Sequence, residues 1–341
     1  MRKSARKNSV LPVWIGVPGA FLVCTILASC FEAAPTTVSH TSDMSSVHTT
    51  FMPGYSQDLG VDGIGFDPMA ILEDFDYGKV STLLDGRTLR EYWIVAEATT
   101  VEVAPGVYYE AWTYNGRVPG PTIRATEGDL VRIYFTNGMM HPHTMHFHGF
   151  HPAEMDGVFE PVLPGASFLY EFEAAPVGVH PYHCHIMPLA SHISRGLYGT
   201  FIVDPKGGWP KVDREMVMVM SGIDLDFDNT NDLYAVNFIP FYYDKHPIQI
   251  FIGERIRIYL VNMLEFDPVN SFHLHANFFY YYPTGTSLVS AEYTDTVSQV
   301  QAQRGILEFS YQFPGKYMFH AHKTEFAELG WTGLFEVRDR P

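Results

Sequence analysis

The sequence predicts an all-β protein built from two related units. Short runs rich in β-branched and aromatic residues lie between Gly, Pro and Asn breaks, as in 91–103, 121–137, 166–174 and 199–205. No long stretch places apolar residues at helical spacing. Residues 121–137 are also similar to 246–262, and two His-x-His pairs follow each copy. A tandem repeat of one all-β unit explains these observations.

The repeat also sets the expected domain limits. Matching histidines are separated by 273 − 146 = 127 and 320 − 183 = 137 positions, which indicates units of about 125–135 residues. We expect domain 1 to span 81–205 and domain 2 to span 211–341. Residues 30–80, rich in Ser, Thr, Pro and Gly at first, are expected to form a tether and a packed arm.

The N-terminus predicts export. Residues 1–29 combine basic residues with a mostly apolar run, which is typical of a secretory signal peptide. The run ends Leu-Ala-Ser-Cys and resembles a lipoprotein cleavage box, with Cys30 as the lipidated residue. Ordinary cleavage nearby is the alternative. Either way we expect a periplasmic or cell-surface protein, with a possible lipid anchor to the membrane.

Composition narrows the class of partner and cofactor. Lys and Arg total 22 against 38 Asp and Glu, a formal charge of −16, so a nucleic-acid partner is not expected. Three cysteines cannot build a disulfide framework. The 16 histidines instead point to bound metal.

Four His-x-His pairs are the strongest signal. A strand places residues i and i+2 on one face, so each pair presents two imidazoles side by side. One pair could be a chance surface feature, but four at matching places in two repeats are hard to explain by packing. Eight imidazoles without a carboxylate or thiolate among them suit copper. The pairs are His146/His148, His183/His185, His273/His275 and His320/His322.

The first unit carries a second ligand set. Cys184 lies between His183 and His185, so its sulfur should point into the domain while its neighbours point out. His143, at an odd offset from His146, should point inward as well. With His192 these residues make a His₂Cys set, the ligand type of a blue-copper electron-transfer centre. A buried small hydrophobe is the alternative for Cys184.

Together these motifs resemble the multicopper oxidases, specifically the two-domain, laccase-like members. The resemblance covers roughly 90–340 and rests on 114–129, "HPHTMHFHG", "MDG", "HCH", "HLH" and "HAH". It implies two cupredoxin-like Greek-key β-barrel domains. It also implies four coppers per subunit: one type 1, one type 2 and two type 3.

The family pattern assigns the cluster ligands and the reaction. His146 and His273 match the type 2 ligands. The implied reaction is the four-electron reduction of dioxygen to water, with electrons from a small-molecule or metal-ion donor relayed from the type 1 copper. Two-domain members form a homotrimer with the clusters at subunit interfaces. The residues that match the type 3 ligands are His148, His183, His185, His275, His320 and His322.

Departures from the pattern are informative. In the second repeat Ala321 stands at the Cys position and Asn270 at the upstream His position, so only domain 1 should hold a type 1 site. Leu197 occupies the axial position, and a non-coordinating side chain there usually raises the copper potential. Met187 is a second candidate for that position.

Two carboxylates match proton-delivery positions of the family. Asp156 in "MDG" matches the acid near the type 2 water, and Glu325 matches the acid after the last pair, although a solvated loop charge is an equal alternative there. Asp129 and Glu254, each after a Gly of the repeated turn, are expected to be structural. The histidines treated as non-ligands are His40, His48, His141, His151, His180 and His246.

Two other functions remain open from the sequence. The spacing from Cys184 to His192 is closer to that of copper nitrite reductases, which use one type 2 copper with three histidines. A non-enzymatic copper-binding or electron-transfer protein would need only the domain 1 site. The eight paired histidines favour the oxidase.

Overall fold

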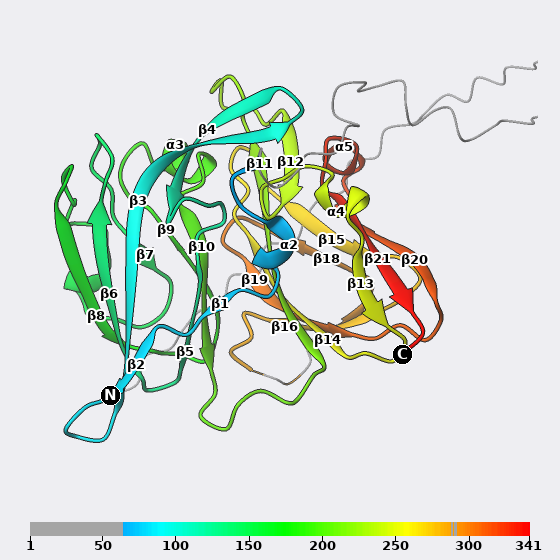
Figure 1. The fold of residues 1–341 in the computed structure, drawn as a ribbon, viewed down its shortest axis with the longest axis horizontal. Helices are drawn as coiled ribbons and strands as arrows, with labels where there is room; N and C mark the ends of the chain where they lie inside the picture. Colours follow the sequence, from blue (N-terminus) through cyan, green and yellow to red (C-terminus); the bar gives the residue numbers. More distant parts are fainter. Residues whose placement is uncertain (1–63, 288, 290–291) are drawn as a thin grey trace, which may run out of the picture. The chain divides into compact units, whose positions relative to one another are not determined.

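The computed structural model describes residues 64–287, 289 and 292–341. The predicted signal peptide, Cys30, His40 and His48 lie outside them. Within this part the all-β prediction is confirmed, since every helix is a short connector (Figure 1). None of these helices has the length and apolar character needed to cross a membrane. The helices are α2 (Pro68–Ile71), η1 (Ala153–Met155), α3 (Leu189–Ser194), α4 (Tyr242–Lys245) and α5 (Thr324–Glu328).

Two sheets form the first domain. In order, one sheet contains β2 (Lys79–Thr82), β3 (Thr88–Ala104), β6 (Leu130–Asn137) and β8 (Ser167–Glu173), with β4 (Val107–Tyr114) also pairing with β3. The other contains β1 (Phe75–Asp76), β5 (Thr122–Thr126), β10 (Tyr198–Asp204), β9 (Gly178–His183) and β7 (His146–Phe147). Strands β1 and β2 come from the segment expected to form an arm, so part of that arm completes both sheets.

The second domain repeats the two-sheet plan. One sheet contains β12 (Leu233–Val236), β11 (Arg214–Ile223), β14 (Ile256–Asn262), β19 (Arg304–Phe309), β16 (Phe279–Pro283) and β17 (Glu292–Thr294). The other contains β13 (Ile248–Phe251), β21 (Thr332–Arg338), β20 (Gly315–His320), β15 (Asn270–Leu274) and β18 (Thr296–Gln299).

Matching hydrogen bonds show the repeat in three dimensions. The Asp129 carboxylate accepts from the Thr126 amide at 2.9 Å, and the Glu254 carboxylate accepts from the Phe251 amide at 2.7 Å. Each carboxylate also pairs with an arginine of a neighbouring strand. Both acids therefore fasten the turn that joins the two repeated strands, β5 to β6 and β13 to β14.

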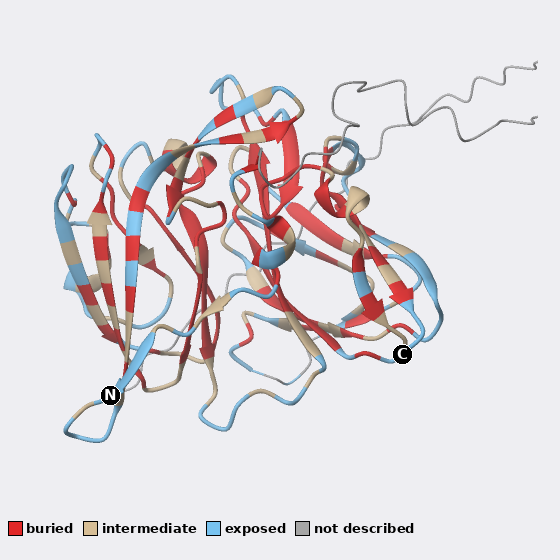
Figure 2. Ribbon diagram, in the orientation of Figure 1, coloured by how far each residue is buried: buried red, intermediate tan, exposed pale blue. Residues whose placement is uncertain are grey.

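Strand periodicity accounts for the cores. Along β6 burial alternates strictly, and Val131, Ile133 and Phe135 are fully buried. In β14 every residue is buried, because this strand lies in the middle of its sheet with β11 and β19 on either side. Figure 2 shows these buried strands as the interior of each domain. The interior of domain 1 holds the inward-facing ligands described below.

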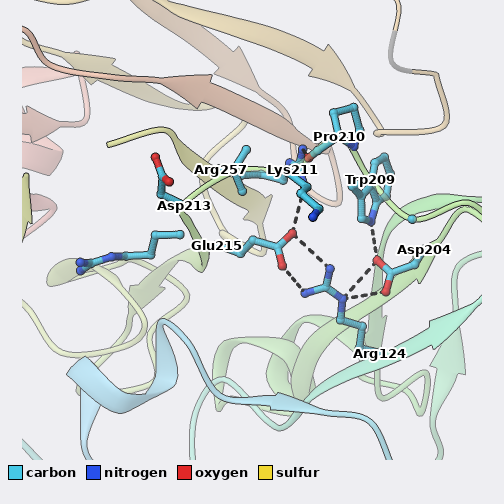
Figure 3. Close-up of a pocket in the computed structure, with 11 residues that line it drawn as sticks. Arg124, Asp204, Trp209, Pro210, Lys211, Asp213, Glu215 and Arg257 are labelled. Atoms are coloured by element: carbon cyan, nitrogen blue, oxygen red, sulfur yellow. Dashed lines mark hydrogen bonds and ion pairs between the residues drawn. The ribbon is translucent and has the colours of Figure 1, made fainter. Parts of the chain in front are cut away.

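A buried ion-pair network ties the two domains together (Figure 3). Arg124 of β5 pairs with Asp204 of β10 and with Glu215 of β11, each at 2.9 Å. Arg257 of β14 pairs with the same Glu215 at 3.0 Å. Burial lowers the pKa of Arg124 and Arg257, but the neighbouring carboxylates outweigh it and raise both pKa values above the ordinary range, so both guanidiniums stay charged. Removal of one partner would leave an uncompensated buried charge.

Two further contacts cross the junction. The hairpin of β3 and β4 contributes Val101, Val103 and Tyr109 to an apolar cluster that otherwise consists mainly of domain 2 residues. In β9, Val179 donates its amide to the Thr284 carbonyl at 2.8 Å and accepts from Arg304 Nε at 2.9 Å. Domain 2 thus supports the strand that leads into Cys184.

Candidate metal centres

One candidate centre lies inside domain 1. The Sγ atom of Cys184 is 3.2 Å from Nδ1 of His192 and 3.7 Å from Nδ1 of His143. The Thr144 amide donates a weak hydrogen bond to the same sulfur at 3.5 Å. The structure therefore brings together the three ligands expected in domain 1, two of which, Cys184 and His143, were expected from strand alternation.

Backbone hydrogen bonds hold these ligands from three directions. His143 exchanges amide–carbonyl hydrogen bonds with Val162 at 3.1 and 3.0 Å. Cys184 follows β9 directly, and its amide donates to the Leu197 carbonyl at 3.0 Å. His192 lies in α3, which joins β9 to β10. Because each ligand is anchored by main chain, their mutual distances are preorganised.

Burial sets the protonation states of this centre. His143 is fully buried, and burial lowers its pKa to about 3; burial likewise lowers the pKa of His192 to about 4. Both imidazoles are therefore neutral at pH 7, the form that binds metals. Burial raises the pKa of the Cys184 thiol, and metal coordination deprotonates such a thiol. Two neutral nitrogens and one thiolate fit a trigonal blue-copper site.

The axial position is apolar. Leu197 is fully buried beside Cys184 in the core of domain 1. Met187, the second candidate for this position, is 78 % exposed. The arrangement favours Leu197, whose side chain offers no donor atom.

A second candidate centre lies at the outer ends of β7 and β9. Ligand atoms of His146, His148 and His183 lie within 4.8 Å of one another. The ring of His185 is 5.2 Å from that of His146, so it borders the same group. We call these four histidines the first outer set.

Domain 2 repeats this set at the ends of β15 and β20. Ligand atoms of His273, His275 and His320 lie within 4.8 Å of one another, and the ring of His322 is 5.1 Å from that of His273. We call these four histidines the second outer set. The side chains within each set lie together, but the ring contacts of the described chain do not join one set to the other.

Hydrogen bonds to backbone carbonyls orient four of the eight rings. Each of these rings uses its Nδ1 atom, which leaves Nε2 free to bind a metal. The Nε2 atoms converge: those of His148 and His183 are 3.3 Å apart, and those of His275 and His320 are 2.9 Å apart. The four bonds join His146 to Asp156, His183 to Cys184, His273 to Asp295 and His320 to Ala321.

Burial again keeps imidazoles of the first outer set neutral. It lowers the pKa of His148 to about 3 and that of His183 to about 4. Burial also lowers the pKa of His146. Neutral, converging Nε2 atoms with no carboxylate between them fit copper.

The two predicted proton carriers differ in placement. An Asp156 carboxylate oxygen is 3.2 Å from Nδ1 of His146. Gly157 makes this approach possible, because it adopts φ 71° and any Cβ there would collide with the Met145 carbonyl oxygen. Glu325 lies in the first turn of α5, is largely exposed and pairs with Lys323 at 3.1 Å. Its role in proton delivery stays a prediction.

Sequence reasoning missed an acid in domain 2. The Asp295 carboxylate is 4.0 Å from Nδ1 of His273, and its carbonyl accepts from that nitrogen. It therefore occupies the place that Asp156 has beside His146. Asp156 follows its histidine by 10 positions and Asp295 follows by 22, so the repeat did not reveal the match.

Sequence reasoning also missed Trp112 of β4. Its ring centre is 5.3 Å from that of His143 and 5.0 Å from that of His192. The ring centre of His141, a histidine treated as a non-ligand, is 5.9 Å from that of Trp112. No sequence motif marks this tryptophan, because its strand precedes the first histidine motif by about thirty residues.

The described residues of domain 2 form no counterpart of the thiolate centre. Ala321 donates its amide to the Trp331 carbonyl as Cys184 does to Leu197, so Trp331 stands at the axial position. The Trp331 amide donates to the Phe326 carbonyl as Leu197 does to His192. Asn270, Phe326 and Trp331 are buried, and no thiolate or imidazole remains there.

The two-sheet domains and a buried cysteine between paired histidines define a copper oxidoreductase built of cupredoxin domains. Multicopper oxidase sequence models match residues 95–208 and 213–341. A solved multicopper oxidase is 58 % identical, with a TM-score of 0.82 over 82 % of this chain and 100 % of that chain. The chain belongs to the multicopper oxidase family.

Nitrite reductases are also related. The copper nitrite reductase of Nitrosomonas europaea is 30 % identical, with a TM-score of 0.68 over 73 % of this chain and 94 % of that chain. The copper-containing nitrite reductase of Neisseria meningitidis serogroup A is 30 % identical over 65 % of this chain. The present chain spans 62 % of the length of that reductase. Family membership and the copper cofactor are therefore established, while the choice of acceptor depends on the site.

Proposed function

We propose that this protein is a laccase-like multicopper oxidase. It would couple one-electron oxidation of a small-molecule or metal-ion donor to four-electron reduction of dioxygen to water. The observation that carries this proposal is the presence of two outer sets of four histidines each. A nitrite reductase site needs three histidines, and an electron carrier needs none outside the thiolate centre.

Different sets of residues would hold the different types of copper. Cys184, His143 and His192 would hold a type 1 copper, and the two outer sets would hold a type 2 copper and a type 3 pair. Bound copper would supply the one-electron redox chemistry that these side chains lack. His183 and His185 are covalent neighbours of Cys184, so the inner centre and the first outer set share one short stretch of backbone.

Protons would come from carboxylates beside the outer sets. Asp156 already lies against His146 and is 3.7 Å from Nε2 of His151. A carboxylate placed there can orient water and hand on protons as oxygen is reduced. Asp295 would orient water and transfer protons in the same way beside His273 in domain 2.

The complete cluster would form between subunits. Each outer set presents four imidazoles, and the second set lies on a different domain from the first. A head-to-tail ring, in which domain 1 of one subunit faces domain 2 of the next, would unite them. We propose a homotrimer with three such clusters, exported to the periplasm or cell surface and anchored there by lipid at Cys30.

Copper content and turnover test the proposal together. An oxidase should bind about four coppers per chain and consume oxygen with a phenol or Fe(II) as donor. Turnover of nitrite with about two coppers per chain would indicate a reductase instead. One copper without turnover of either acceptor would indicate a carrier.

A further inference from the structure

The buried position of the type 1 ligands raises a question of access. His143 is fully buried and His192 is only 4 % exposed, so very little of either ring is open to an external donor. The residues that cover the two rings therefore lie between the centre and most of the surrounding solvent.

Trp112 is the covering residue that contacts both ligands. Its indole meets the rings of His143 and His192 edge-on, at 5.3 and 5.0 Å between ring centres. Trp112 is itself only half-buried, so it spans the distance between solvent and the ligands. Its amide donates to the Arg195 carbonyl at 2.8 Å, which fixes the strand against the end of α3.

A cation from one domain and an aromatic ring from the other hold the indole in place. The Arg195 guanidinium lies 4.8 Å from the ring centre of Trp112 and 3.7 Å from that of Phe227. Phe227 belongs to the domain 2 loop between β11 and β12. It adopts φ 62°, a conformation rare for a bulky residue, so its packing must outweigh that cost.

We propose that Trp112 is the electron-entry residue of the type 1 centre and that Arg195, clamped by Phe227, is its positioning residue. With copper held by Cys184, His143 and His192, one electron would pass from the donor to the metal, with no atom or proton transferred. The indole, in edge contact with both imidazoles, would supply π orbitals between donor and metal and be unchanged after each transfer. This inference rests on the proposed function.

The test is anaerobic reduction of the copper-loaded protein, followed at the blue absorption band. Hexaammineruthenium(II) and ferrocyanide serve as donors of opposite charge. Trp112→Leu should slow bleaching by ~10-fold with both donors, equivalent to about 1.4 kcal/mol of activation free energy. The position of the band and the reduction potential should stay as in the wild type, because all three ligands are kept.

Trp93→Leu is the matched control. Trp93 is also a partly exposed tryptophan of the same sheet, but its stacking partner is Tyr134 and not a type 1 ligand. Its replacement should leave the bleaching rate unchanged. If Trp112→Leu fails to fold, Trp112→Phe keeps a ring in place and should still be measurably slower than the wild type.

The role of Arg195 is tested separately, with two substitutions. Arg195→Gln removes a positive charge near the copper and should lower the type 1 reduction potential, whereas Arg195→Lys should preserve it. Arg195→Gln should also slow bleaching, because the indole loses its cation partner, whereas Arg195→Lys should keep the wild-type rate. Equal bleaching rates in the wild type and both variants would overturn the role of Arg195.

Bleaching of Trp112→Leu at the wild-type rate, or faster, would overturn the role of Trp112. A wild-type protein without a blue band would instead refute the proposed function, so the two failures are distinguishable.

Discussion

The two domains share a backbone plan but differ in what fills the same interior position. Domain 1 places a thiol and two imidazoles there, whereas domain 2 places Ala321, Asn270, Phe326 and Trp331. The Phe272, Phe319 and Trp331 rings pack together with centres 5.8 to 6.0 Å apart. Both domains nevertheless keep their outer histidines. The outer sets therefore do not require an inner metal site, and one domain can specialise in stability.

The largest expected effect comes from the inner thiol. Cys184→Ser should abolish the blue band and reduce donor oxidation to background, because an alcohol does not replace the thiolate ligand. The outer sets should still load, so copper content should fall by one per chain. Absorption spectroscopy and metal analysis check this.

Ala321→Ser, at the matching position of domain 2, is the control for that variant. It should leave the blue band intact. A blue band that survives Cys184→Ser would show that the inner centre is assigned incorrectly.

Loss of one outer histidine should impair the outer copper sites without affecting the inner blue centre. His320→Ala removes an Nε2 atom of the second outer set and should lower cluster occupancy and oxygen uptake by ~10-fold or more. The blue band should remain, since His320 lies in the other domain from Cys184. Metal analysis measures the copper content and the absorption spectrum measures the blue band. Loss of the blue band would mean that the inner centre of domain 1 depends on the outer set of domain 2.

The aromatic filling of domain 2 predicts a stability effect. Trp331→Ala should lower the free energy of unfolding of the copper-free protein by roughly 3–5 kcal/mol, because a large buried ring leaves a cavity. Leu197→Ala at the matching position removes a smaller side chain and should cost about 2–5 kcal/mol. Denaturant titration measures both. A larger loss for Leu197→Ala would mean that the inner centre, and not the aromatic cluster, is the more tightly packed of the two.

Acid should weaken domain 1 before domain 2 in the copper-free protein. Burial lowers the pKa of His143 to about 3 and of His192 to about 4. In domain 2 burial also lowers the pKa of His275 and His320, but His275 is exposed and His320 only half-buried. Below about pH 6.5 the unfolded chain binds protons that these folded imidazoles do not. The free energy of unfolding therefore falls as pH falls from about 6.5 toward 3–4, by about 1.4 kcal/mol per pH unit for each fully buried imidazole.

Limited proteolysis at pH 7 and pH 5, with cleavage sites mapped by mass spectrometry, measures that order. Cleavage should rise first within domain 1. Preferential cleavage of domain 2 at pH 5 would contradict the explanation by histidine burial. Bound copper should suppress the effect, because a coordinated imidazole cannot take up a proton.

The smallest effect concerns a matched pair of hydroxyl groups. Thr144 Oγ1 accepts from the His185 amide at 3.1 Å, and Ser271 Oγ accepts from the His322 amide at 2.8 Å. Thr144→Val and Ser271→Ala should each cost about 1 kcal/mol of unfolding free energy, since one hydrogen bond is lost in each. Thermal melts of the copper-free variants compare them, and a much larger cost for Thr144→Val alone would break the equivalence of the two domains.

Strand alternation explains how much of the site could be read from the sequence. Residues i and i+2 share a face, so the four pairs and the inward turn of Cys184 followed from spacing alone. The repeat revealed Ala321 and Asn270 for the same reason. These positions lie in or directly beside strands, where register leaves little freedom.

Loops account for what the sequence did not reveal. Phe326 lies in a connecting helix, and Asp295 follows a loop longer than the one before Asp156, so neither position matched its domain 1 counterpart at a constant offset. Trp112 approaches the histidines from a strand distant in sequence. Contacts of this kind depend on how sheets pack, which residue spacing does not specify.

The mixed apolar cluster at the junction means that the chain cannot be divided into working halves. Domain 1 expressed alone would leave the β3–β4 hairpin without its apolar cover and Arg124 without Glu215. Such a fragment would tend to aggregate instead of serving as a small, diffusible blue protein. Engineering a minimal electron shuttle from this scaffold would therefore require a redesigned surface on the hairpin as well as a shorter gene.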